Sequence, residues 1–254
     1  MRQTTPVRIA LAQIAPAFID VEANVRAAVR AIATAADRGA ELTAFPELSL
    51  TGYELDAIAD TPSAWLSARD PRLDGVRRIC AATRTAAILG APWQDHEGRP
   101  RLAAIIVNPD GDVHASGKQY LHGPESTLFV ADEPAPPFVV GGWRVAVAVC
   151  FDAAHPAHAA QAAAQGADLY IGSALYEVGQ ERRSDLHYGA RAMDNRMFAA
   201  MVNYAGESGG YTSCGQSGAW SPTGDVLRRA PGSEETLLMV DFERSELEQF
   251  RPPR

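Results

Sequence analysis

The sequence predicts an α/β layered domain that contains a mixed β-sheet. Three observations favour it: runs of strand-forming residues alternate with runs of helical period, two turn signals each join a pair of strands, and no linker exceeds loop length. A chain of 254 residues buries enough apolar surface to fold without disulfides or structural metals. We therefore expect one domain over residues 1–254.

The beginning of the chain is expected to contain two strands separated by a helix. Residues 7–12 are rich in strand-forming side chains. Asp20 is a helix N-cap, Gly39 ends that helix, and residues 42–45 form the next strand. The apolar stripe of the helix recurs after four, three and four residues, at Val25, Val29, Ile32 and Ala36.

A second helix and a hairpin are expected next. Asp70 is an N-cap, and Pro71 occupies the first helical position, where a missing N–H costs nothing. This helix continues through Val76, Ile79 and Cys80. In the turn 108–111, proline presets one dihedral angle and glycine accepts a positive φ. The strands of this part are expected at residues 86–89, 102–107 and 113–116.

The second half of the chain continues the alternation. Helices are expected at residues 157–165 and 181–195. A second hairpin, with arms 216–220 and 226–227, turns at residues 221–225. The remaining strands are expected at residues 144–149, 169–171, 198–202 and 236–240.

Charge and cysteine content exclude several classes of protein. With 23 Lys and Arg against 31 Asp and Glu, the net charge is −8, which disfavours binding to nucleic acids and to anionic membranes. No leader peptide and no apolar stretch of about 18 residues is recognised. Three cysteines are too few for a disulfide framework, so we expect a cytoplasmic protein in a reducing compartment.

Familiar metal and phosphate motifs are absent from the sequence. There is no Cys-x-x-Cys, no His-Glu-x-x-His, no glycine-rich phosphate loop and no Gly-x-Ser-x-Gly nucleophile turn. His155 and His158 lie three residues apart, but no third ligand accompanies them. We expect neither a metal nor an organic cofactor.

The three cysteines differ in their surroundings. Cys80 lies on an apolar helix face and is expected in the core. Cys214 lies in a glycine-rich loop, where we expect an exposed thiol without an activating group. Cys150 follows an apolar strand, at the kind of strand end where α/β proteins bind ligands. Its position alone fits a core cysteine better than a nucleophile.

A nucleophilic thiol needs a base or a cation beside it, and the sequence offers one of each. Glu47 ends an apolar strand, and Lys118 follows the second arm of the first hairpin. Taken singly, Glu47 fits a solvated carboxylate or a helix cap, and Lys118 fits a surface lysine. Together with Cys150, however, all three lie at strand ends.

Three segments around these residues resemble the nitrilase, or carbon–nitrogen hydrolase, superfamily. Residues 45–53 are similar to its first signature, residues 118–121 with Glu125 to its second, and residues 149–152 with Pro156 to its third. Further matches, in the family's order, are residues 191–195, Asn203, Gly206, residues 215–217 and residues 222–224. The resemblance extends over residues 7–241.

The resemblance implies a four-layer α-β-β-α sandwich with two central mixed sheets and a Glu-Lys-Cys site. In that site Glu47 is the general base and Cys150 the nucleophile that forms a thioester. Lys118 and the backbone N–H of Phe151 stabilise the oxyanion. Glu125 is a second carboxylate that orients Lys118 and the substrate.

The resemblance also implies a small-molecule amide substrate and a homodimer. By their position after the matched motifs, the residues expected to line the pocket are Tyr53, Tyr120, Ser173, Ala174 and Tyr176, for which ordinary packing is the alternative. The run 214–217 is similar to the branch that hydrolyses small aliphatic or ω-amino amides. We therefore predict an amidase of small linear amides. The alternatives are an N-carbamoyl amidohydrolase, a nitrilase, an N-acyltransferase and a catalytically silent binding protein.

Overall fold

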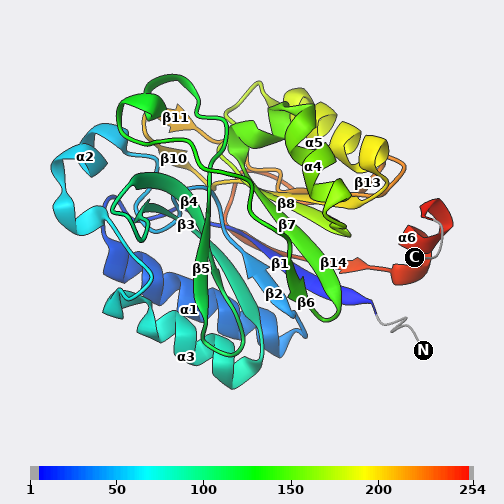
Figure 1. Ribbon diagram of the computed structural model, residues 1–254, viewed down its shortest axis with the longest axis horizontal. Helices are drawn as coiled ribbons and strands as arrows, with labels where there is room; N and C mark the ends of the chain where they lie inside the picture. The colour runs from blue at the N-terminus through cyan, green and yellow to red at the C-terminus, as the bar shows by residue number, and fades with distance from the viewer. Residues whose placement is uncertain (1–5, 252–254) are drawn as a thin grey trace.

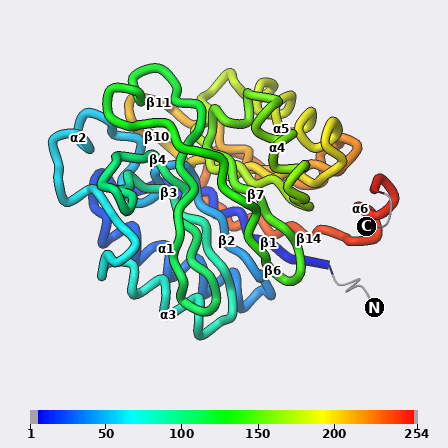
Figure 2. Tube along the Cα trace, in the orientation of Figure 1, coloured from blue at the N-terminus to red at the C-terminus, as the bar shows by residue number. Residues whose placement is uncertain are grey.

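Two mixed six-stranded sheets form the centre of the computed structural model, which describes residues 6–251. The first sheet is parallel between β1, β2 and β3 and antiparallel elsewhere. In spatial order its strands are β14 (Thr236–Phe242), β1 (Val7–Gln13), β2 (Leu42–Ala44), β3 (Ala86–Gln94), β4 (Pro100–Val107) and β5 (Val113–Gly117). The first and last strands of the chain therefore pair with each other (Figure 2).

The second sheet has the same mixed character. Its three central neighbours β7, β8 and β9 are parallel, and the outer strands are antiparallel. In spatial order its strands are β13 (Val226–Arg229), β12 (Gly218–Trp220), β9 (Phe198–Val202), β8 (Leu169–Ser173), β7 (Trp143–Val149) and β6 (Phe138–Val140).

Helices cover the outer face of each sheet (Figure 1). The helices α1 (Val21–Asp37) and α3 (Asp74–Thr83) pack on the first sheet, and α4 (Pro156–Ala164) and α5 (Glu181–Asn195) pack on the second. The inner faces pack against each other, because side chains from both sheets share one buried cluster that includes Ile9, Ile88, Val145, Ile171 and Phe198. The expected four-layer α-β-β-α sandwich is confirmed.

The helix caps predicted from the sequence are present at both helices, but the second α-helix begins later than expected. The Asp20 side chain accepts a hydrogen bond from the Ala23 N–H at 2.9 Å, and Gly39 has a φ of +83°. Asp70 caps the Arg72 N–H at 2.9 Å, but the turn that follows, Pro71–Leu73, is a 3-10 helix. The α-helix α3 begins only at Asp74.

Several elements were not expected from the sequence. They are α2 (Leu55–Asp60), β6, the two-stranded ribbon β10 (Glu207–Ser208) and β11 (Tyr211–Thr212), α6 (Arg244–Phe250), and the 3-10 helices Pro62–Ala64, Gly123–Thr127 and Cys150–Ala154. All of them have seven residues or fewer, which is too short to show a periodic pattern. The expected strand 216–220 begins only at Gly218, since Gly215 and Gln216 have positive φ angles. No helix within residues 6–251 has both the length and the apolar character needed to cross a membrane.

The turn after β2 packs against β3 so closely that β3 needs a glycine there. A Cβ atom at Gly90 would lie 2.2 Å from the Leu48 backbone nitrogen and 2.4 Å from the Pro46 carbonyl oxygen. The Gly90 N–H donates to Ser49 Oγ at 2.9 Å, and its carbonyl accepts from the Leu50 N–H at 2.9 Å. This contact fixes the backbone on both sides of residue 47.

We predict that Gly90→Ala destabilises the protein, because the new methyl group meets backbone atoms that cannot move aside. The expected loss is about 3 kcal/mol of unfolding free energy, or roughly 6–12 °C in Tm, measured by thermal unfolding. The control is Gly232→Ala, since no atom lies within 4 Å of the added Cβ and φ is not positive there. Equal Tm values for the two variants would contradict the prediction.

Candidate active site

Three charged side chains are buried together where β2 and β5 end. Glu47 follows β2, Lys118 follows β5, and Glu125 lies in the 3-10 helix Gly123–Thr127, with each residue only 1% exposed. Lys118 Nζ donates to Glu47 Oε1 at 2.7 Å and to Glu125 Oε1 at 2.6 Å. Because an ammonium has three donors, one remains for another acceptor.

Glu125 is held on both carboxylate oxygens. Its Oε1 accepts the Tyr53 hydroxyl at 2.6 Å as well as Lys118, and its Oε2 accepts the His122 N–H at 2.7 Å. Glu47 differs, because its Oε2 is buried and accepts no hydrogen bond from residues 6–251. One carboxylate is thus fully engaged, and the other keeps an acceptor free.

Cys150 comes from the second sheet and shares a cavity with the three charged residues. It follows β7, is the first residue of the 3-10 helix Cys150–Ala154 and has a φ of +43°, a conformation that non-glycine residues rarely adopt. Its Sγ lies 3.7 Å from the Leu175 carbonyl oxygen. Phe151 follows in the first turn of the 3-10 helix, where N–H groups have no partner within the helix.

The electrostatics of the site favour a neutral thiol beside a carboxylate that titrates near neutrality. Burial raises the pKa of Glu47 to about 7, with Lys118 opposing the rise and Glu125 adding to it. Burial and the Glu47 charge together raise the pKa of the Cys150 thiol. The carboxylates outweigh burial at Lys118 and raise the pKa of its ammonium. The arrangement can therefore pass a proton from sulfur to Glu47 while Lys118 stays charged.

Asp152 joins the two segments that carry Lys118 and Cys150. Its Oδ1 accepts the N–H groups of Gln119 and Tyr120 at 3.0 and 2.9 Å, and its Oδ2 accepts the Val149 N–H at 2.9 Å. Burial raises the pKa of this carboxyl to about 6. Asp152 lies in the segment 149–152 that resembles the third family signature, but the sequence alone did not indicate what this residue does.

Comparison with known proteins identifies the family. The model of the carbon-nitrogen hydrolase family matches residues 8–252. The chain belongs to the carbon–nitrogen hydrolase family. It is therefore an enzyme of the carbon–nitrogen hydrolase type.

The most similar relatives include two curated proteins and a solved amidase. A hydrolase of Pseudomonas protegens is 28% identical over 96% of this chain and 86% of its own length. An (R)-stereoselective amidase of Pseudomonas sp. is 28% identical over 96% of this chain and 88% of its own. An amidase of Nesterenkonia sp. AN1, from the nitrilase superfamily, superimposes with a TM-score of 0.85 at 29% identity and covers 99% of this chain and 96% of its own.

Mutants of that Nesterenkonia amidase have been solved with small amides. One is a complex with butyramide, and another carries the acetamide moiety of fluoroacetamide covalently attached at the active-site cysteine. These ligands were observed in the Nesterenkonia amidase.

The cavity of this carbon–nitrogen hydrolase encloses about 120 Å³. Four of its lining residues are Glu47, Lys118, Glu125 and Cys150, and Tyr53 and Tyr176 line it as expected from the sequence. The other lining residues were not expected and are His122, Leu175, Glu177, Gln180, Arg183, His187 and Tyr211. Most of them come from the loop before α5, the start of α5 and the ribbon β10–β11, whose approach to Cys150 is set only by the tertiary fold.

Three residues expected in the pocket lie outside this lining. The Tyr120 ring stacks on His155 with the ring centres 3.8 Å apart. Ser173 is fully buried at the end of β8, and the buried Ala174 donates its N–H to the Val202 carbonyl oxygen at 2.9 Å. Sequence position alone misplaces them, because these contacts with other parts of the chain are set by the tertiary fold.

The other two cysteines are both buried. Cys80 lies in the core as expected, and burial raises its pKa to about 12. Cys214 is only 6% exposed, so the expected exposed thiol is wrong. The glycine-rich loop folds inward around Asn203, whose side-chain amide donates to Cys214 Sγ at 3.5 Å and to the Gly215 carbonyl at 2.8 Å. Within residues 6–251 no group of three His, Cys, Asp or Glu residues is placed to hold a metal.

We predict that Glu125→Gln lowers the pH at which Cys150 becomes reactive. The Glu125 charge helps to raise the pKa of Glu47 to about 7, so its removal should lower that pKa and let Glu47 accept a proton at lower pH. The measurement is the rate of Cys150 alkylation by iodoacetamide against pH, read by mass spectrometry. In the unmodified protein the rate should rise as pH passes about 7.

The matched control is Glu133→Gln, an exposed carboxylate that should leave the profile unchanged. A midpoint that stays in place, or moves to higher pH, in Glu125→Gln would refute the electrostatic role of this residue.

Proposed function

We propose that this carbon–nitrogen hydrolase is an amidase that hydrolyses small linear amides through a thioester on Cys150, and that residues 1–254 form one catalytic domain. The observation that carries the proposal is Cys150 in one cavity with the Lys118 ammonium, which is held between Glu47 and Glu125. The amide ligands of the similar Nesterenkonia structures support it.

The first half of the reaction forms the thioester. Glu47 Oε2 takes the proton from Cys150 Sγ as the sulfur attacks the amide carbon, and the carbonyl π electrons move onto oxygen. The free donor of Lys118 and the Phe151 N–H stabilise that oxyanion, and such donors are typically worth ~3–4 kcal/mol each. When the intermediate collapses, the C–N bond breaks, and Glu47 returns the proton to the leaving nitrogen, which departs as ammonia.

The second half consumes the thioester. Glu47 removes a proton from water, and the resulting hydroxide adds to the thioester carbon over the same oxyanion donors. The C–S bond breaks, the thiolate takes the proton back from Glu47, and the carboxylic acid product leaves. Glu125 holds Lys118 and Tyr53 in place throughout, since its oxygens already accept both side chains.

The size of the cavity supports a small substrate. Its volume of about 120 Å³ is below the ~300–1,000 Å³ typical of pockets for drug-sized ligands. The lining is apolar or aromatic at Leu175, Tyr53 and Tyr176, whereas Glu177, Gln180 and Arg183 add polar groups. A short chain with a terminal amide matches this combination.

Ammonia release from a substrate panel tests the proposal. The purified enzyme is incubated with short aliphatic amides, ω-amino amides, N-carbamoyl amino acids and the matching nitriles. Highest turnover with the amides is expected. Turnover confined to nitriles or to carbamoyl compounds would overturn the amide assignment, and a product that appears only with an added amine acceptor would indicate an acyltransferase.

We predict that Cys150→Ala abolishes amide turnover and leaves the fold intact, because only the attacking sulfur is removed. Cys80→Ala should keep its turnover, although removal of a buried side chain costs on the order of 1 kcal/mol of stability. Turnover is measured as ammonia release and folding by circular dichroism and Tm. An acyl adduct in the unmodified protein, found by mass spectrometry on any residue other than Cys150, would contradict the assignment.

We also propose a cytoplasmic homodimer. Leu186 and Met193 lie seven residues apart on α5, and their exposed fractions of 60% and 53% leave apolar surface on one helix face. The three cysteines are free thiols, which fits a reducing compartment. Light scattering in reducing buffer should give the mass of two chains, and Leu186→Glu with Met193→Glu should give the mass of one.

A further inference from the structure

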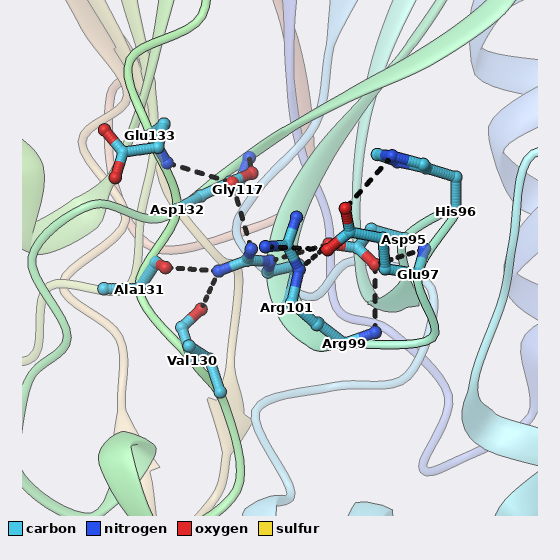
Figure 3. Close-up of polar contacts among 10 residues, drawn as sticks. All are labelled: Asp95, His96, Glu97, Arg99, Arg101, Gly117, Val130, Ala131, Asp132 and Glu133. Atoms are coloured by element: carbon cyan, nitrogen blue, oxygen red, sulfur yellow. Dashed lines mark hydrogen bonds and ion pairs between the residues drawn. The ribbon is translucent and has the colours of Figure 1, made fainter.

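One arginine outside the cavity is almost completely buried at the base of the loop that carries Lys118 and Glu125. Arg101 on β4 is 3% exposed, and Figure 3 shows its guanidinium among acceptors from two segments, Asp95 and residues 130–132. Its Nη1 donates to the Val130 carbonyl at 3.0 Å and to the Ala131 carbonyl, and its Nε donates to Asp95 at 3.2 Å. Its Nη2 lies 3.5 Å from Asp132 Oδ1.

Asp132 links Arg101 to Gly117, the residue just before Lys118. Its Oδ2 accepts the Gly117 N–H at 3.0 Å, and its own N–H donates to the Lys118 carbonyl at 3.0 Å. A Cβ atom on Gly117 would lie 2.5 Å from Asp132 Oδ2. The carboxylate can occupy this position only because residue 117 is glycine.

The loop between these contacts is anchored to β4 on both sides of Arg101. At its start the Lys118 N–H donates to the Leu102 carbonyl at 2.7 Å, and at its end the Val130 N–H donates to the Pro100 carbonyl at 2.8 Å. The loop therefore leaves and returns at neighbouring residues of one strand. Between these points the loop places Lys118 Nζ 2.6 Å from Glu125 Oε1.

We propose that Arg101 and Asp132 are positioning residues, which close the base of loop 117–132 and so fix Lys118 and Glu125 relative to Glu47 and Cys150. This inference rests on the proposed function of those four residues. Neither Arg101 nor Asp132 lines the cavity, so they act through the backbone of Gly117 and Lys118. The effect matters because a displacement of about 1 Å in a catalytic group costs roughly 10²-fold in rate.

The central test compares Arg101→Met with Arg99→Met. Arg99 also pairs with Asp95, at 2.7 Å, but its side chain is 46% exposed and no hydrogen bond or ion pair joins it to residues 130–132. Arg101→Met should lower kcat for the best amide of the panel roughly 10–100-fold with little change in KM. Arg99→Met should keep both constants, and Arg101→Lys should recover part of kcat.

Two readouts do not depend on amide turnover. Hydrogen exchange of residues 117–132 should accelerate in Arg101→Met and stay unchanged in Arg99→Met. The pH midpoint of Cys150 alkylation by iodoacetamide should move in Arg101→Met, because Glu47 no longer faces Lys118 and Glu125 at their native distances. A residue that only stabilised the fold would lower Tm without moving that midpoint.

Double substitution tests the glycine contact. Gly117→Ala alone should lower kcat by displacing the Asp132 carboxylate. In an Asp132→Ala background, Gly117→Ala should lower kcat little further. The space beside residue 117 is then already free of the carboxylate, and the hydrogen bond from the Gly117 N–H is already lost.

The outcomes separate the two proposals. If the enzyme turns over no member of the panel, the proposed function fails, whereas hydrogen exchange and the alkylation midpoint still report on the loop. If both readouts and kcat are the same in Arg101→Met and Arg99→Met, or if Gly117→Ala and Asp132→Ala act additively, the positioning role of Arg101 and Asp132 is overturned.

Discussion

The structure depends on one buried cation, the Lys118 ammonium held between two carboxylates. An isolated charge of this kind is costly to bury, and two hydrogen bonds of 2.6 and 2.7 Å to ionised partners offset that cost. The three charges sum to one excess negative charge when both carboxylates are ionised. Burial raises the pKa of Glu47 and the Glu125 charge adds to the rise, but the contact with Lys118 opposes it, so that the pKa is about 7 while the ammonium remains charged. The same contacts that make burial tolerable therefore also make Glu47 suitable as a base.

This cluster constrains the chain well beyond the cavity. Its members come from two segments, and each segment has its own fixed contacts. Gly90 lies beneath the Glu47 turn, whereas the loop 117–132 is held by Asp132 beside Gly117 and by the Tyr53 hydroxyl on Glu125. The glycines at 90 and 117 share one physical reason. At both positions another group approaches within 3 Å of where a Cβ would be, so the close approach itself excludes a side chain.

Sequence reasoning succeeded where a signal is local and periodic. The helix 181–195 and the strand 198–202 have the bounds that the sequence predicts. A long helical pattern and a compact apolar run are local signals, which can be recognised without knowledge of the tertiary fold. It failed where tertiary contacts decide. The ribbon β10–β11 is two residues per strand, and Cys214 is buried because Asn203 draws its loop inward, which no feature of the run 209–215 reveals. Glu47, Lys118, Glu125 and Cys150 were singled out by motif, and their roles stay predictions, whereas Arg183 and His187 reach the cavity only through the placement of α5.

The distance between base and nucleophile is set by the packing of the two sheets. Glu47 extends from the first sheet and Cys150 from the second, and the residues next to them in sequence, Leu48 and Val149, belong to the same buried inner cluster. Leu48 and Cys150 both have φ near +45°, at +48° and +43°, so each strand turns sharply where it leaves that cluster. A densely packed interior resists small displacements. The inner core therefore serves two purposes at once, since the side chains that hold the sheets together also determine how far sulfur lies from the carboxylate that must take its proton.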